Sequence, residues 1–183
     1  MPSRIEIREI DITSLNVDAI VNAAHPSLMP ATTEEQTLHA LAGPKLSEEC
    51  KHVAPCPVGE ARITRGYNLL ANFVIHTAGP AWGGGETDED VYLRQCYKNS
   101  FEIGKTFNIK TIAFPCISTG QNGFPVQRAA FIAMQEILLY LESHPDFKSV
   151  VLACKSEKEV WEYESAFDRC SGKNSQNKIK TAI

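Results

Sequence analysis

A strand, a glycine-containing loop and a helix follow one another between residues 111 and 141, and this succession constrains the fold strongly. Residues 111–117 (TIAFPCI) form an apolar run of strand length with β-branched and aromatic members. After the loop 117–125, apolar side chains recur at helical spacing, namely Val126, Ala129, Ala130, Ala133, Met134, Ile137, Leu138 and Leu141. A strand that runs through a short loop into a helix indicates an α/β sheet.

The loop itself carries the first functional signal. Gly120 and Gly123 allow a tight turn and a close approach of the backbone to a ligand. Free N–H groups and the positive end of the following helix favour an anion such as a phosphate. Ser118 and Thr119 add hydroxyl donors. The spacing alone is a weak motif, so an ordinary strand-to-helix turn is an equally good interpretation at this point.

The rest of the chain alternates strand and helix patterns after a β-rich start. We expect strands near 5–10, 18–22, 60–66, 73–80 and 150–154, and helices near 33–42, 45–53, 93–107, 126–141 and 161–168. This order predicts a three-layer α/β/α domain with a central mixed sheet over residues 1–170, followed by a polar, disordered tail over 171–183. Ligands of such sheets bind beyond the carboxyl ends of strands, where Asn22, the loop 25–35 and the loop 118–124 emerge.

Composition excludes several classes of function. The 183 residues carry a net charge of −4, which argues against general binding of nucleic acid through a basic surface. No apolar run approaches the roughly 20 residues of a membrane span, and the charged start is unlike a signal peptide. The six cysteines form no C-x-x-C pair, which favours buried free thiols in a reducing cytosol over zinc or disulfides. We therefore expect a cytoplasmic monomer without a metal or a cofactor.

Five segments in order resemble the macrodomain family. They are 11–13 (DIT), 17–24 (VDAIVNAA), 59–69 (GEARITRGYNL), 74–80 (VIHTAGP) and 117–120 (ISTG). The branch that they most resemble is that of the MacroD-type ADP-ribosyl-hydrolases, and the match runs from about Arg4 to about Asp168. The resemblance implies the three-layer macrodomain fold, and it implies ADP-ribose, free or attached to protein, as the ligand.

The resemblance also implies roles for individual residues. Asp11 would accept a hydrogen bond from the adenine amino group, with the Ile12 backbone beside it. In the second loop Asn122 stands where the family has an aromatic residue against the distal ribose, although Phe124 is close by. The implied ligand-binding residues are Asp11, Ile12, Asn22, Ser118, Thr119, Gly120, Gln121, Asn122, Gly123 and Phe124.

The loop after residue 24 departs from the MacroD-type pattern. His25 replaces a second asparagine, residues 30–33 (PATT) replace a run of glycines, and residues 34–36 (EEQ) replace Val-Asp-Gly. Pro30 and the β-branched threonines cannot approach a ligand as glycines do. Glu35 is one methylene longer than the family's catalytic aspartate, and an offset near 1 Å can cost on the order of a hundredfold in rate. The adenosine and diphosphate half of the site is thus preserved, and the catalytic half is rebuilt.

Three functions remain open from the sequence. The first is an ADP-ribose reader with weak or absent hydrolysis. The second is a mono-ADP-ribosyl-protein hydrolase or O-acetyl-ADP-ribose deacetylase in which His25 and Glu35 replace the usual catalytic pair. The third is a degenerate interaction scaffold. For both residues a structural or binding role is the alternative, with His25 hydrogen-bonding the ribose or capping the loop and Glu35 serving as a helix N-terminal charge. His39 and His76 suit local packing and hydrogen bonding.

Overall fold

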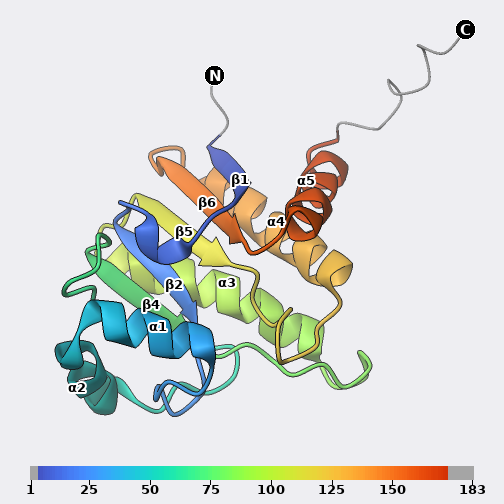
Figure 1. Cartoon of the computed structure of the whole chain (residues 1–183). Helices are drawn as coiled ribbons and strands as arrows, with labels where there is room; N and C mark the ends of the chain where they lie inside the picture. The colour runs from blue at the N-terminus through green and yellow to red at the C-terminus, as the bar shows by residue number, and fades with distance from the viewer. Residues whose placement is uncertain (1–3, 173–183) are drawn as a thin grey trace, which may run out of the picture.

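Six strands form one mixed sheet in the order β1-β6-β5-β2-β4-β3, and the computed structural model describes residues 4–172 of the chain (Figure 1). The strands are β1 (Ile5–Glu9), β2 (Ala19–Ala23), β3 (Ala61–Arg65), β4 (Phe73–Thr77), β5 (Thr111–Pro115) and β6 (Ser149–Cys154). The helices are α1 (Thr33–Ala42), α2 (Pro44–Val53), α3 (Glu89–Thr106), α4 (Val126–Ser143) and α5 (Glu157–Cys170), with a 3₁₀ turn, η1 (Ile12–Ser14). The predicted α/β/α architecture is confirmed. Residues 173–183 of the predicted tail lie outside the described residues.

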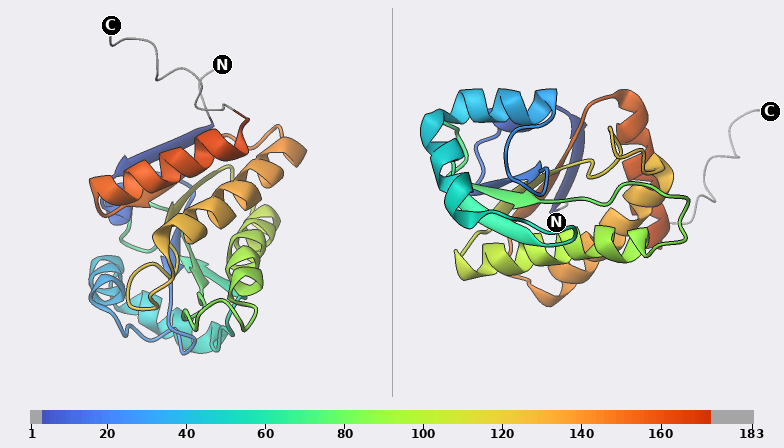
Figure 2. Two further views of the ribbon diagram at one scale, coloured as in Figure 1. Left: turned by 90° about the vertical axis from the view of Figure 1, so that its right-hand side faces the viewer. Right: turned by 90° about the horizontal axis from the view of Figure 1, so that it is seen from below.

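Every neighbouring pair of strands is parallel except β3 with β4. The carboxyl ends of β1, β6, β5, β2 and β4 therefore lie at the same edge of the sheet. Helices α1 and α3 lie on opposite sides of the sheet, as the view from below shows (Figure 2, right). The strand β1 lies at the sheet edge with Ile5 and Ile7 partly buried, as its alternating sequence predicts.

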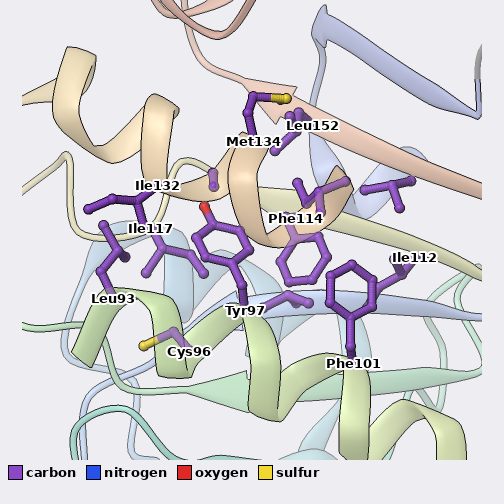
Figure 3. Packing of buried hydrophobic residues seen from close by; sticks show 14 of the residues in the cluster. Leu93, Cys96, Tyr97, Phe101, Ile112, Phe114, Ile117, Ile132, Met134 and Leu152 are labelled. Atoms are coloured by element: carbon purple, nitrogen blue, oxygen red, sulfur yellow. The ribbon is translucent and has the colours of Figure 1, made fainter. Parts of the chain in front are cut away.

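The two faces of the sheet bury different sets of side chains. Alternate residues of β5 belong to different clusters, since Ile112 and Phe114 pack on the side of α3 and α4, whereas Ala113 packs with residues of α1 and α2. Tyr97 and Phe101 of α3 point toward Phe114 (Figure 3), with ring centroids 5.0 and 5.1 Å from that of Phe114. This continuous apolar core supports the strand from which the glycine loop departs.

A carboxylate ties the central strands together at their amino ends. Asp18 Oδ2 accepts hydrogen bonds from the N–H groups of Lys110 and Thr111, both at 2.8 Å, and the Asp18 N–H donates to Thr111 Oγ1 at 2.7 Å. Burial alone would raise the pKa of Asp18, but these donors bring that pKa below its ordinary value. The starts of β2 and β5 are thereby held side by side, and the loops at their far ends are positioned with them.

The break between the first two helices follows its sequence signal. Gly43 adopts φ +88°, outside the range that other residues favour, and Pro44 opens α2 at its first position. Within residues 4–172, no helix combines the length and the apolar character needed to cross a membrane.

Candidate functional site

Three segments gather at the carboxyl edge of the parallel strands. They are the turn that begins at Asp11 after β1, the loop 24–32 after β2 and the loop 116–125 after β5 (Figure 1). The last two loops lie at the same end of the sheet in the view from below (Figure 2, right). The structure thus places Asn22 and the loops 25–35 and 118–124 at the sheet edge where the sequence predicts them to emerge.

The loop after β5 is folded back on itself. The Gly123 N–H donates to the Gly120 carbonyl at 2.9 Å, and the Phe124 N–H donates to the Ser118 carbonyl at 3.0 Å. Gly123 has φ +66°, and Ser118 has φ +68°, a conformation that is uncommon for a residue with a Cβ. Gly120 and Gln121, which lie between these left-handed residues, are exposed.

The turned backbone leaves hydrogen-bond donors free. In the part of the chain that the structure describes, the N–H groups of Gly120, Gln121 and Asn122 have no acceptor. The buried hydroxyl of Ser118 likewise has no partner there. Consecutive free N–H groups form an anion-binding concavity. The α4 helix also begins at Val126 without a side-chain cap, so its positive end is open to an anion.

A second loop supports this concavity from one side. The Asn122 side chain donates to the Gly79 carbonyl at 3.0 Å, and the Trp82 N–H donates to the Asn122 carbonyl at 2.8 Å. The Trp82 and Phe124 rings lie 4.8 Å apart, and Phe124 is only 2% exposed. Phe124 therefore supports the loop from the core side, and its contact with a ligand stays a prediction.

The loop after β2 is built around a buried carboxylate. Glu35 is 2% exposed, and its Oε1 accepts a hydrogen bond from the His25 N–H at 2.9 Å. Its Oε2 accepts from the N–H groups of Ala31 and Thr32 at 3.0 and 2.9 Å. Thr32 Oγ1 accepts in return from the Glu35 N–H at 3.2 Å, which completes a capping box. The carboxylate is thus fully engaged by the backbone of its own loop.

The structure does not bring the His25 ring and the Glu35 carboxylate together. The only hydrogen bond between these described residues runs from the His25 main chain. The exposed His25 ring instead serves its own turn, because Nδ1 accepts from the Ser27 N–H at 3.2 Å and lies 2.8 Å from Ser27 Oγ. For both residues the contacts match the structural alternative, and their catalytic roles stay predictions.

Asp11 keeps one carboxylate oxygen available. Its Oδ1 accepts hydrogen bonds from the N–H and the hydroxyl of Thr13, at 2.9 and 2.7 Å, and so caps η1. Among residues 4–172, Oδ2 of Asp11 has no partner, and the residue is exposed. The strand-end cap and an adenine contact are therefore compatible, since each uses a different oxygen atom.

A buried histidine orients Asn22. The two residues are paired in the register of β2 and β4, and Asn22 Nδ2 lies 3.2 Å from His76 Nδ1. Because the amide nitrogen can only donate, Nδ1 accepts, and Nε2 carries the proton that it donates to Thr64 Oγ1 at 2.9 Å. Burial lowers the pKa of His76 to about 3, so the ring is neutral. Within the described chain, Asn22 Oδ1 has no partner and is left as an acceptor.

The sequence did not reveal this link between Asn22 and His76. The available signal was that Asn22 and His76 are polar residues within two apolar strands. They face each other only because β2 and β4 pair with Asn22 opposite His76. Sequence patterns alone suggested hydrogen bonding for His76 without naming the partner.

Two thiols and a carboxylate lie beneath the glycine loop. One ligand atom each from Cys116, Cys154 and Glu159 falls within 4.8 Å of the others. The thiols lie 3.8 Å apart, and Glu159 already accepts from the Lys155 N–H at 2.7 Å and from Thr119 Oγ1 at 3.4 Å. The hydrogen bond with Cys154, together with burial, raises the pKa of Cys116. The Cys116 thiol is therefore protonated and poorly nucleophilic, and the Glu159 carboxylate serves to join α5 to the loop.

The comparisons with known proteins identify the family. The profile of the Macro domain family matches residues 21–133. The chain belongs to the macro domain family. A macro domain-containing protein of Methanosarcina mazei is 49% identical over 151 residues, which cover 82% of this chain and 81% of that protein. A relative from Escherichia fergusonii named O-acetyl-ADP-ribose deacetylase is 43% identical over 162 residues, which cover 86% of this chain and 92% of the relative.

Solved macrodomain structures agree with this fold. The Oceanobacillus iheyensis macrodomain with ADP has a TM-score of 0.87 and 34% identity, and the match covers 92% of each chain. The Trypanosoma brucei macrodomain in complex with ADP-ribose has a TM-score of 0.83 and 34% identity, covering 88% of this chain and 68% of that one. The macrodomain predicted from the five sequence segments is confirmed.

The buried imidazole of His76 makes the macrodomain sensitive to acid. As the pH falls from about 6.5 toward about 3, the unfolded chain takes up a proton at this ring that the folded chain does not. The free energy of unfolding should therefore fall over this range, and His76→Asn should flatten that slope while keeping an acceptor near Asn22. Urea denaturation at a series of pH values measures it. His52→Asn, at an exposed position, is the matched control, and a wild-type slope in His76→Asn would contradict the prediction.

Proposed function

We propose that this macrodomain binds ADP-ribose, free or linked to protein. It hydrolyses the bond between ADP-ribose and its acceptor slowly or not at all. The observation that carries the proposal is the run of three free N–H groups at Gly120, Gln121 and Asn122. Backbone donors that are already oriented bind a diphosphate without rearrangement, which lowers the entropy cost of binding. The Trypanosoma brucei relative in complex with ADP-ribose supports the choice of this ligand.

The remaining parts of the ligand have matching groups along the same edge. The free Oδ2 of Asp11 suits an amino group such as that of adenine. Asn22 Oδ1 suits a hydroxyl donor such as that of a ribose. In the strand order of the sheet, β5 lies between β1 and β2. The glycine loop after β5 therefore lies between Asp11, which follows β1, and Asn22 of β2. An adenine, a diphosphate and a second ribose fit this sequence of acceptors and donors.

The loop after β2 supports binding without rapid turnover. A general base must reach the proton that it removes, or the water that it activates. Glu35 is buried, and it accepts three backbone hydrogen bonds, so its carboxylate is occupied in shaping the loop. The alternative proposal, O-acetyl-ADP-ribose deacetylation or removal of mono-ADP-ribose from protein, is supported by the name of the Escherichia fergusonii relative.

Removal of the Asp11 carboxylate should weaken binding of the nucleoside half. Asp11→Asn retains the oxygen that caps η1 and presents an amide donor to the adenine amino group, so the charge-assisted hydrogen bond is lost. We expect a loss of about 1.5–3 kcal/mol for both ADP-ribose and AMP, measured by calorimetry. Unchanged affinity in the variant would place adenine elsewhere. Absence of heat with the unsubstituted protein at millimolar ligand would leave only the scaffold function.

A side chain at Gly120 should block the diphosphate while the fold survives. A Cβ at Gly120 meets no protein atom within 4 Å, whereas Gly123 has φ +66° and would be strained by valine in any case. Gly120→Val should therefore keep its melting temperature and lose at least about tenfold in ADP-ribose affinity through steric overlap. Gln127→Ala, at an exposed position of α4, is the control. Equal ADP-ribose affinities of the two variants would indicate that the loop is an ordinary strand-to-helix turn.

Turnover distinguishes the reader from the enzyme. We expect hydrolysis of glutamate-linked ADP-ribose and of O-acetyl-ADP-ribose to be at least about a hundredfold slower than in MacroD-type enzymes, because the catalytic loop is repositioned. Glu35→Gln should cost about 2 kcal/mol of stability through its lost charged hydrogen bonds, without changing the slow rate. His25→Ala should change neither quantity. Fast hydrolysis that either substitution abolishes would establish an enzyme with a rebuilt site.

A further inference from the structure

The proposed ligand segments lack a positive side chain. Residues 11–14, 22–33 and 117–125 contain no lysine and no arginine. The chain as a whole carries a net charge of −4, so its average field repels an anion. A diphosphate would then be held by backbone dipoles alone, unless a cation from another segment reaches the cleft.

Lys155 leaves the sheet at the middle of this edge. It directly follows Cys154, the last residue of β6, and β6 lies between β1 and β5. The Ile10 N–H donates to the Cys154 carbonyl at 3.1 Å, which places Lys155 beside the turn that contains Asp11. On its other side, the Lys155 N–H donates to Glu159, whose second oxygen accepts from Thr119 of the glycine loop. Lys155 is thus anchored between the adenine-side turn and the diphosphate loop.

The ammonium group of Lys155 pairs with the first turn of α1. Its Nζ lies 2.5 Å from Oε1 of Glu34, in the first turn of α1. The pair links the segment between β6 and α5 to the start of α1, and β5 lies between β6 and β2 in the sheet. The hydrogen bond from Lys155 lowers the pKa of Glu34, so the pair is charged at neutral pH.

An anion can replace Glu34 as the partner of Lys155 at little cost. Both side chains are 60% exposed, and exposed ion pairs of this kind contribute little to stability. Among the described residues, the other interactions of the Glu34 carboxylate are local, with the Thr32 side chain and with its own N–H. An anion that reaches Nζ therefore has only a weak partner to displace.

We propose that Lys155 is a diphosphate-binding residue and that Glu34 is the internal counter-ion which the diphosphate displaces. This inference rests on the proposed binding of ADP-ribose and deepens it. In the free protein Glu34 neutralises Lys155 and disfavours other anions by its own charge. On binding, the ammonium group turns from the carboxylate to the phosphate oxygens, so the affinity for ADP-ribose includes the cost of breaking the pair.

Calorimetry with ADP-ribose and with adenosine tests the exchange. Lys155→Met should weaken ADP-ribose binding by about tenfold, the scale of one charge-assisted hydrogen bond, and should leave adenosine unchanged. Glu34→Gln should tighten ADP-ribose binding by about two- to fivefold, the scale of an exposed ion pair. Lys158→Met and Glu157→Gln make the same charge changes at exposed positions of α5 and serve as matched controls. Added salt should weaken the wild type more than Lys155→Met.

Four results would contradict the proposal or one part of it. Equal affinities of Lys155→Met and Lys158→Met for ADP-ribose would overturn the proposal while leaving ADP-ribose binding intact. Weaker binding in Glu34→Gln would overturn the counter-ion role, because it would make Glu34 a ligand contact. A matching loss of adenosine binding in Lys155→Met would assign Lys155 to the nucleoside. Absence of ADP-ribose binding by the unsubstituted protein would overturn the proposed function and this inference together.

Discussion

The parallel pairing of β1, β6, β5 and β2 determines where every part of the candidate site lies. Parallel strands place all their carboxyl ends at one edge, so segments far apart in the sequence emerge side by side. At the opposite edge, the hydrogen bonds from Lys110 and Thr111 to the Asp18 carboxylate align β2 and β5. The apolar core around Phe114 then fixes the strand that ends in the glycine loop. Ligand chemistry at the edge depends on this register more than on any single side chain.

Within that frame, the carboxylate of Glu35 decides the character of the loop after β2. A glycine-rich loop offers its N–H groups to a ligand, whereas this loop directs those of His25, Ala31 and Thr32 to its own glutamate. The loop is therefore satisfied internally, and the donors for an anion come from the other loop, at Gly120 and the two residues after it. The two loops therefore differ in how their backbone donors are used, and the proposed binding without rapid turnover rests on that difference.

The sequence predicted the features that depend on local chemistry. Periodicity located the strand and the helix around residues 117–125, because the spacing of apolar residues is a local property of the sequence. The link between Asn22 and His76 depends on strand register, which no local pattern contains. Likewise, the burial of Phe124 depends on packing against Trp82 in a separate loop, and the contact between Lys155 and Glu34 joins opposite parts of the chain. Non-local geometry of this kind lies beyond single-sequence reasoning.

The position of β1 also has a consequence for biosynthesis. The first strand of the chain pairs with β6, the last, with Ile5 opposite Val150. During translation, β1 leaves the ribosome long before its partner exists, and its backbone groups cannot find their sheet until β6 has been made. The turn that holds Asp11 and the strand end that carries Lys155 are brought together by that last pairing. A nascent chain that ends before residue 149 would have the glycine loop but not β6, so the candidate site is complete only once that strand has been made.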